Sequence, residues 1–222
     1  MRPGSRSSAR EWKPGCPEWI VENGSPAAEA ARRSVLESLI ADDANHLPSL
    51  EMAKAWHRRM FEGIAPHPDY LGGFRDAGEV PYCLQDYNVE VGGLPGVSSD
   101  HVLAELDRFI SEFVAKIHGL DATWPVSDGP PTQEQTERVV QVAAWAHGEW
   151  VRIHPFANGN GRTSRLRTNY VLVRYGFGPA LQIRPRPGEP YGLAARGSMA
   201  TGDHRAMEVV IWLVLARSYG IA

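Results

Sequence analysis

At residues 154–165 the chain reads His154-Pro155-Phe156-Ala157-Asn158-Gly159-Asn160-Gly161-Arg162-Thr163-Ser164-Arg165. This stretch lies between two apolar, helix-like runs, residues 134–151 before it and residues 166–175 after it. Two glycines on either side of an asparagine predict a tight loop whose backbone can approach a ligand closely. A helix that begins directly after this loop would point its first free N–H groups at the ligand, and such a position favours phosphate. We therefore predict a mostly α fold in which two central helices flank a phosphate-binding loop.

Three side chains in or beside this loop could bind phosphate or transfer a proton. Arg162 and Arg165 are three residues apart and would lie on one face of a helix, where their guanidinium groups offer paired donors to more than one phosphate. His154 directly precedes the loop, and an imidazole is a suitable general base near neutral pH. The combination of a phosphate cradle, two cations and a base predicts a site for phosphoryl-type transfer.

The whole stretch resembles the signature of the Fic (Fido) family, His-Pro-Phe-x-Asp/Glu-Gly-Asn-Gly-Arg-x-x-Arg. The match holds at every fixed position except one, where Asn158 stands in place of the acidic residue. The resemblance implies the helical Fic fold, with two central helices flanking the signature loop and a small β-hairpin flap. It also implies a protein adenylyltransferase that moves AMP, or another NMP, from a nucleotide triphosphate to a Ser, Thr or Tyr hydroxyl of a target protein.

The resemblance assigns a role to most of the signature. His154 would be the catalytic base that deprotonates the target hydroxyl. Arg162 and Arg165 would bind the outer phosphates of ATP, the expected donor. The remaining phosphate contacts, through backbone N–H groups and the Asn160 amide, would come from Gly159, Asn160 and Gly161. Further along the chain, Tyr191 resembles a family tyrosine near the adenine pocket, so we expect it to bind the nucleotide.

Asn158 is the departure from the family pattern. The acidic residue at this position resembles the family's Mg²⁺ ligand, and Mg²⁺ prefers charged oxygen. An asparagine carbonyl can still bind the metal, but without formal charge, so we expect Asn158 to hold Mg²⁺ more weakly. Three outcomes are open: a slower transferase, a metal held mainly by the nucleotide, or a catalytically weakened nucleotide-binding protein. Gly161 in place of lysine argues against the kinase-like branch of the family.

Two other interpretations use the same residues differently. A phosphocholine- or UMP-transferring relative would place another donor at the same loop. A purely structural helical protein would carry the signature as an ordinary helix–turn–helix corner, and the number of matched positions makes this the weakest alternative.

Length and composition indicate one soluble domain with a sizeable core, because 222 residues suit a single domain. A formal charge of −3 argues against a nucleic-acid-binding surface. No apolar run approaches the ~18–20 residues that span a bilayer, so we expect no membrane partner. Cys16 and Cys83 show neither a metal-binding spacing nor a disulfide framework. We therefore expect a reducing compartment and a cytoplasmic location.

The chain divides into three parts. Residues 1–13 are rich in Arg, Ser, Pro and Gly and are expected to be a disordered tail. Residues 14–49 are expected to be an N-terminal helical segment, and residues 50–222 the Fic domain. The predicted N-caps are Ser25, Ser99 or Asp100, and Thr132. The predicted helices cover residues 25–41, 50–62, 100–118, 134–151, 166–175, 191–200 and 205–217.

Residues 86–96 differ from the helical pattern, because Tyr87, Val89 and Val91 alternate with polar residues before Gly92 and Gly93. This pattern predicts a short β-hairpin. The resemblance implies that this hairpin is the flap on which a protein substrate docks, at residues 87–96, by adding a strand to its edge.

Regulation has a weaker signal. Ser25 and Glu29 resemble part of the family's inhibitory motif, but Ala30 stands at its last position, and helix capping and first-turn charge already explain both residues. The alternatives are inhibition by a separate partner chain and no such regulation.

Three further polar residues are expected to have structural roles. His57 is expected to be a packed, hydrogen-bonded residue of a helix, and His147 to lie in the core or to support a residue of the site, without being a ligand itself. Arg75 is expected to pair with an acidic group, with a contact to substrate as the alternative.

Overall fold

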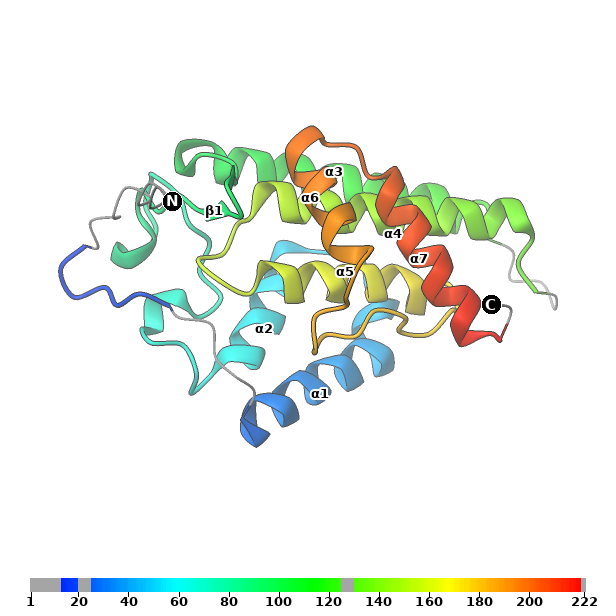
Figure 1. The fold of residues 1–222 in the computed structure, drawn as a ribbon, viewed down its shortest axis with the longest axis horizontal. Coiled ribbons are helices and arrows are strands. Elements are labelled where there is room, and N and C mark those ends of the chain that lie inside the picture. The colour runs from blue at the N-terminus through cyan, green and yellow to red at the C-terminus, as the bar shows by residue number, and fades with distance from the viewer. Residues whose placement is uncertain (1–12, 20–24, 125–129, 221–222) are drawn as a thin grey trace, which may run out of the picture.

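The computed structural model describes residues 13–19, 25–124 and 130–220, and Figure 1 shows how their elements are arranged. The fold is mostly helical, as predicted, with one small antiparallel sheet. The predicted tail, residues 1–13, lies outside the described residues except for Lys13. The helices are α1 (Pro26–Ala41), α2 (Leu50–Phe61), α3 (Val102–Asp121), α4 (Gln133–Ile153), α5 (Asn160–Arg174), α6 (Tyr191–Thr201) and α7 (Arg205–Ser218).

Two helices, α4 and α5, form the centre of the molecule, and the signature loop joins them. They lie along the long axis in Figure 1, with α3, α6 and α7 packed on α4 and with α1 and α2 packed on α5. The start of α4 follows from a capping box: the Thr132 hydroxyl accepts from the Gln135 N–H (3.2 Å), and the Gln135 side chain accepts from the Thr132 N–H (2.8 Å). The prediction of two central helices around the loop is therefore confirmed.

The core is continuous from α3 through α4 to α5. Trp150 of α4 lies completely buried, and its ring contacts Phe109 of α3 and Phe156 of the signature loop. Arg167 of α5 is also buried, and its guanidinium carbon lies 3.9 Å from the centre of the Trp150 ring. Phe156 is thus held by the core, as aromatic packing of this kind stabilises a fixed ring position.

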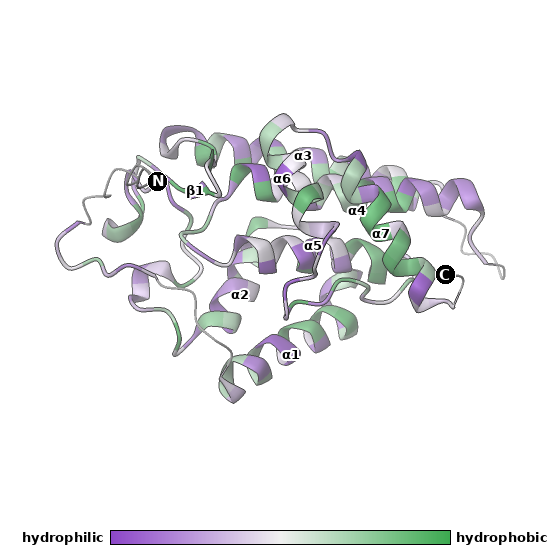
Figure 2. Ribbon diagram, viewed as in Figure 1, coloured by the Kyte–Doolittle hydropathy of each residue, from purple (hydrophilic) through white to green (hydrophobic). Residues whose placement is uncertain are grey.

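Figure 2 shows α7 hydrophobic along most of its length, whereas α5 alternates between polar and apolar residues. Among the described residues, no helix combines the length and the apolar character needed to cross a membrane. The polar residues of α5 include Arg162 and Arg165, the two arginines of the candidate site.

The starts of the other helices test the predicted caps. Ser25 and Ser49 accept hydrogen bonds from the N–H groups of Ala28 and Met52, and so cap α1 and α2. The prediction for α3 was wrong, because a short 3₁₀ turn, Ser99–His101, precedes it and no side chain caps its first turn. Ser99 is instead buried, and its N–H donates to the Asn88 side chain (2.8 Å).

Glu149 of α4 accepts hydrogen bonds from several basic side chains. Its carboxylate accepts hydrogen bonds from Arg152 (3.0 Å), Arg108 (2.9 Å) and His204 (3.2 Å). Burial alone would raise the pKa of Glu149, but the bonds from His204 and Arg152 outweigh it and lower the pKa to about 2. Gly148 makes room for this cluster, since a Cβ there would lie 2.0 Å from the His204 ring. The cluster ties α3 and the start of α7 to α4.

The predicted hairpin is present. Strands β1 (Glu90–Val91) and β2 (Leu94–Pro95) pair antiparallel, with Gly92 and Gly93 in the turn at positive φ. The strands are shorter than the sequence pattern suggested. We call residues 87–97 the flap.

The expectation that the two cysteines stay apart was wrong. Cys16 and Cys83 are buried and joined by a disulfide, with their Cα atoms 5.4 Å apart. The partners are 67 residues apart in sequence, and only the fold brings them together. The cysteine argument for a reducing compartment therefore no longer holds.

The disulfide holds a segment, residues 13–19, against the domain. Trp19 in this segment is buried and packs edge-on against Phe61, with ring centres 5.0 Å apart, and stacks on Tyr70. The Trp19 carbonyl lies 3.4 Å from the amide nitrogen of Asn158. The N-terminal segment thus reaches the signature loop.

Candidate active site

His154 ends α4 in a left-handed conformation, with φ 55° and ψ 56°. Its ring Nδ1 lies 3.1 Å from the Val151 carbonyl, which can only accept, so Nδ1 carries the proton of the neutral ring. Nε2 then has the free lone pair. Burial lowers the pKa of His154 to about 4 against a smaller opposing effect of the Val151 carbonyl, and the nearby Arg75 lowers it further. At neutral pH the ring is therefore uncharged and able to accept a proton at Nε2.

Arg75 fixes the position of His154. Its buried guanidinium donates to the carbonyls of His154 (2.7 Å) and Ile153 (2.8 Å), which are among the free carbonyls at the end of α4. It also donates to the carbonyls of Tyr87 (3.2 Å) and Val97 (2.6 Å), at the two ends of the flap. Arg75 therefore joins the flap to the signature loop.

The structure gives Arg75 four backbone carbonyl partners that we did not predict. The expected pairing with an acidic group stays a prediction. Every residue has a backbone carbonyl, so the sequence does not indicate which carbonyls a guanidinium will bind.

Asn160 clamps the signature loop. Its side-chain oxygen accepts from the Phe156 N–H (2.9 Å), and its side-chain nitrogen donates to the Phe156 carbonyl (2.8 Å). The Asn160 residue is 1% exposed. The amide oxygen and one amide N–H thus match the backbone pair of Phe156, while the second amide N–H is not used by these bonds. The expected contact of the Asn160 amide with phosphate stays a prediction.

His57 of α2 supports the loop from the other side. The Gly72 N–H donates to Nδ1 (3.1 Å), so Nε2 carries the proton and donates to the Asn158 carbonyl (3.0 Å). Its ring stacks on Phe156 with centres 3.9 Å apart. Burial lowers the pKa of His57 to about 3, so the ring is neutral. The prediction of a packed, hydrogen-bonded histidine is confirmed.

The first turn of α5 presents free backbone donors. Gly159 caps the helix at φ 82°, and a Cβ at this position would lie 2.5 Å from the Phe61 ring, so glycine is required for both reasons. No hydrogen bond among the described residues uses the N–H of Asn160 or Gly161. Free N–H groups at the N-terminus of a fifteen-residue helix form an anion-binding position.

Arg165 lies beside this turn. Its Nη1 would be 3.4 Å from a Cβ at Gly161, which places the guanidinium next to the free N–H groups. Nη1 donates to the Tyr191 hydroxyl (2.9 Å), and Nη2 donates to the Ile183 carbonyl (2.8 Å). Arg165 is buried, so these bonds fix its direction.

Arg162 and Tyr191 complete the predicted set. The Arg162 guanidinium lies over the Phe61 ring of α2, 4.2 Å from its centre. Tyr191 begins α6 and is 3% exposed, with its hydroxyl bonded to Arg165. The two signature arginines thus rest on different neighbours, α2 and α6, on either side of the first turn of α5.

Asn158 fits a metal ligand poorly. Its side-chain oxygen already accepts from the Gly159 N–H at 2.6 Å, and its amide nitrogen lies 3.4 Å from the Trp19 carbonyl. The oxygen carries no formal charge, which Mg²⁺ sites use to offset dehydration. The residues at this position do not form a protein-held Mg²⁺ site.

The flap lies against the histidine. A Cβ at Gly96 would be 3.0 Å from the His154 Cβ and 2.7 Å from the Val89 side chain. At the turn of the flap, the Gly92 carbonyl accepts a hydrogen bond from Arg196 of α6 (2.7 Å). The flap is therefore fixed between His154 at its base and α6 at its turn.

Glu29, the candidate for autoinhibition, is in α1, where its carboxylate forms an exposed pair with Arg33 of the same helix (3.9 Å). Ser25 caps the helix through the Ala28 N–H. Both residues therefore do what helix capping and local charge pairing require.

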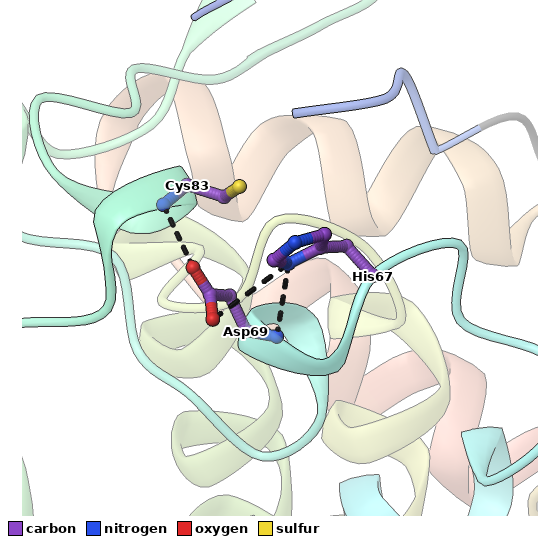
Figure 3. A group of neighbouring side chains, drawn as sticks. All are labelled: His67, Asp69 and Cys83. Carbon is purple, nitrogen blue, oxygen red and sulfur yellow. Dashed lines mark hydrogen bonds and ion pairs between the residues drawn. The ribbon is translucent and has the colours of Figure 1, made fainter. Parts of the chain in front are cut away.

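A second group of polar side chains, away from the signature loop, contains His67, Asp69 and Cys83 (Figure 3). Asp69 accepts from the Cys83 N–H (3.0 Å), and the Asp69 N–H donates to His67 Nδ1 (3.2 Å). The Cys83 sulfur is in the disulfide with Cys16 and is not a thiolate. The Asp69 carboxylate links the two short 3₁₀ turns Pro68–Tyr70 and Tyr82–Leu84, and the disulfide removes the Cys83 sulfur as a metal ligand.

Comparison with known proteins gives a consistent picture. Protein adenylyltransferase fic-1 from Caenorhabditis elegans is 28% identical over 153 residues, which are 69% of this chain and 24% of the relative. The chain thus spans about a quarter of the length of that relative. A Fic-domain signalling protein from Bacteroides thetaiotaomicron superposes with a TM-score of 0.58 at 17% identity, over 91% of this chain and 76% of that one.

BepC from Bartonella tribocorum, solved with bound AMPPNP, superposes with a TM-score of 0.55 at 14% identity, over 84% of this chain and 85% of that one. At these low sequence identities, both structural similarities show a shared fold and nothing more. The Fic/DOC family model matches residues 47–172, more than half of the 222 residues, and this match includes the whole signature loop and most of α5. The chain belongs to the Fic/DOC family.

Proposed function

We propose that the chain is a nucleotidyltransferase that moves AMP from ATP to a Ser, Thr or Tyr hydroxyl of a target protein. The observation that carries the proposal is the neutral His154 ring, with its Nε2 lone pair free, in a loop that runs directly into the free N–H groups of α5. The adenylyltransferase name of the C. elegans relative and the AMPPNP bound to BepC support AMP and ATP as the group and the donor.

The reaction assigns one task to each residue. His154 Nε2 accepts the proton of the target hydroxyl, a step that typically contributes about 10²–10⁴ in rate. The hydroxyl oxygen then bonds to the α-phosphorus, and the bond from that phosphorus to the bridging oxygen of the β-phosphate breaks. Pyrophosphate leaves with the electron pair. The N–H groups of Asn160 and Gly161 stabilise charge on the phosphates, and Arg162 and Arg165 bind the outer ones.

The neutral state of His154 suits this role. A base must be unprotonated before it can act, and burial keeps the pKa of His154 near 4. The Arg75 bonds to the Ile153 and His154 carbonyls fix the end of α4, so the ring needs little reorganisation before the reaction.

The target segment would bind at the flap. The edge of β1, with Val91 43% exposed, offers backbone groups for an added strand. Because the base of the flap contacts His154 at Gly96, a hydroxyl on that added strand would be carried toward the ring.

A second candidate is a nucleotide-binding protein with weakened catalysis. Asn158 favours it, because its oxygen is neutral and already accepts from the Gly159 N–H. In this case ATP binds without transfer, and Asn158→Asp restores the reaction by adding the charged oxygen that Mg²⁺ prefers.

One experiment separates these candidates. The chain is incubated with lysate proteins, Mg²⁺ and either ATP, UTP or CDP-choline, and modified peptides are identified by mass spectrometry. The proposal predicts AMP adducts on Ser, Thr or Tyr with ATP, which are lost in His154→Ala. Binding of ATP without adducts, followed by adducts with Asn158→Asp, would support the second candidate. Adducts only with UTP or CDP-choline would assign a different donor.

A further inference from the structure

His147 lies on α4, seven positions before His154, and is completely buried. Its Nε2 is 2.9 Å from the Tyr191 hydroxyl, and the two rings meet edge to face with centres 5.4 Å apart. The same hydroxyl receives the hydrogen bond from Arg165 Nη1, also at 2.9 Å. The three side chains therefore form a buried relay, His147–Tyr191–Arg165, which starts inside α4 and ends at the first turn of α5.

The direction of each hydrogen bond in this relay follows from the donors and acceptors. A guanidinium has donors only, so the Tyr191 oxygen must accept from Arg165. The Tyr191 oxygen has a second lone pair, so the hydroxyl could also accept from a protonated His147 Nε2, but its own hydrogen would then have no acceptor among the described residues. The arrangement that uses the Tyr191 hydrogen makes His147 Nε2 the acceptor and places the histidine proton on Nδ1.

His147 Nδ1 is buried without a hydrogen-bond partner among the described residues. A proton on Nδ1 therefore leaves one buried polar group unpaired, whereas a proton on Nε2 would leave two unpaired, Nδ1 and the Tyr191 hydrogen. Burial, followed by Arg165 and then His204, lowers the pKa of His147 to about 3, and the ring stays neutral. Its one hydrogen-bonding contact is thus the bond to Tyr191.

We propose that His147 is a positioning residue for nucleotide binding: it orients the Tyr191 hydroxyl, which in turn holds the Arg165 guanidinium beside the N-terminus of α5 for the outer phosphates. The inference rests on the proposed function for the role of Arg165, whereas the relay itself is a property of the chain without nucleotide. Tyr191 then acts through Arg165 rather than through its own contact with the nucleotide base.

A double-mutant cycle tests the relay. ATP and AMP affinities are measured by calorimetry for His147→Leu, Tyr191→Phe and the double variant. Loss of one buried hydrogen bond corresponds to an affinity change of about five- to tenfold. We expect His147→Leu to weaken ATP by about that factor and AMP by less than about twofold, because AMP lacks the outer phosphates. The double variant should be no weaker than Tyr191→Phe alone, since His147 acts only through that hydroxyl.

Two further variants separate positioning from packing. His147→Gln keeps an acceptor oxygen at the end of its side chain and should restore ATP affinity to within about threefold of wild type. Val139→Ala, a fully buried change on the same helix, should lower the melting temperature without changing ATP affinity. Wild-type ATP affinity in His147→Leu, an additive double variant, or equal losses for ATP and AMP would each overturn the inference.

A spectroscopic measurement on the wild-type chain needs no nucleotide. Long-range ¹H–¹⁵N correlation spectra distinguish the two neutral histidine tautomers, and the relay predicts a proton on Nδ1 of His147. A proton on Nε2 would overturn the relay directly. If wild type binds no ATP, the proposed function fails and so does the nucleotide role of His147, whereas the tautomer still decides whether the relay exists.

Discussion

Asn160→Ala tests the clamp on the signature loop. The asparagine side chain makes two hydrogen bonds to the backbone of Phe156, at 2.9 and 2.8 Å, and Phe156 is completely buried. Removing the amide leaves the Phe156 N–H and carbonyl without partners, and no water can easily reach them.

The expected loss can be estimated from these two groups. Each unsatisfied buried group costs about 1–3 kcal/mol, so the free energy of unfolding should fall by about 2–6 kcal/mol. For a domain of this size, a loss of about 3 kcal/mol corresponds to a melting temperature lower by about 6–12 °C. Because the loop loses its fixed shape, ATP affinity should fall as well.

The chain offers a matched control. Asn169 on α5 makes the same pair of bonds to Leu181, at 2.8 and 2.9 Å, and both residues are buried. Asn169→Ala should therefore lose a similar free energy of unfolding while keeping ATP affinity once folded.

The assay combines urea unfolding, followed by tryptophan fluorescence, with calorimetric titration of ATP. If Asn160→Ala weakened ATP binding but unfolded at the wild-type urea concentration, the amide would contact phosphate directly and the clamp would be refuted.

Three further substitutions test the Glu149 cluster, the disulfide and the glycine that begins α5. The folded-state pKa of Glu149, about 2, is below its ordinary value of 4.5, so the carboxylate stabilises the fold above pH 4.5 and loses this effect as the pH falls toward 2. The stability advantage of wild type over Glu149→Gln should shrink by about 3 kcal/mol between pH 5 and pH 2 in urea titrations, and a constant difference would contradict the cluster. Cys16→Ser opens a disulfide whose partners are 67 residues apart, and should lower the free energy of unfolding by about 4 kcal/mol; equal effects of a thiol reductant on wild type and variant would contradict this. Gly159→Ala combines a left-handed φ of 82° with a contact of 2.5 Å to Phe61 and should cost about 2–5 kcal/mol. Gly176→Ala shares the φ of 82° without any atom within 4 Å, so it should lose only about 1–2 kcal/mol, and similar melting temperatures for the two variants would refute the role of Phe61.

The sequence predicted those features that depend on local patterns. Apolar spacing at the helical period identified the helices, and the predicted N-cap at Thr132 located the start of α4. The alternation at Tyr87, Val89 and Val91 identified the flap, although only four of its residues pair as strands. The signature motif, residues 154–165, also located the candidate active site, at the turn between His154 and the start of α5.

Features that depend on distant contacts could not be read from the sequence. The partners of Arg75 are carbonyls up to 79 residues away, and backbone groups are the same for every residue type. The disulfide joins two cysteines that share no local pattern. The bonds of Asn160 to Phe156 were not predicted, because an amide between two glycines suits a phosphate and a neighbouring backbone equally well.

The most direct test of the central claim follows the label from two forms of ATP. In the proposed reaction, the target oxygen attacks the α-phosphorus at the start of α5, and His154 is the base. Label in the α-phosphate should therefore appear on protein, label in the γ-phosphate should leave with pyrophosphate, and His154→Ala should abolish labelling while retaining ATP binding. Transfer of the γ-label, or unchanged transfer of the α-label in His154→Ala, would contradict the account.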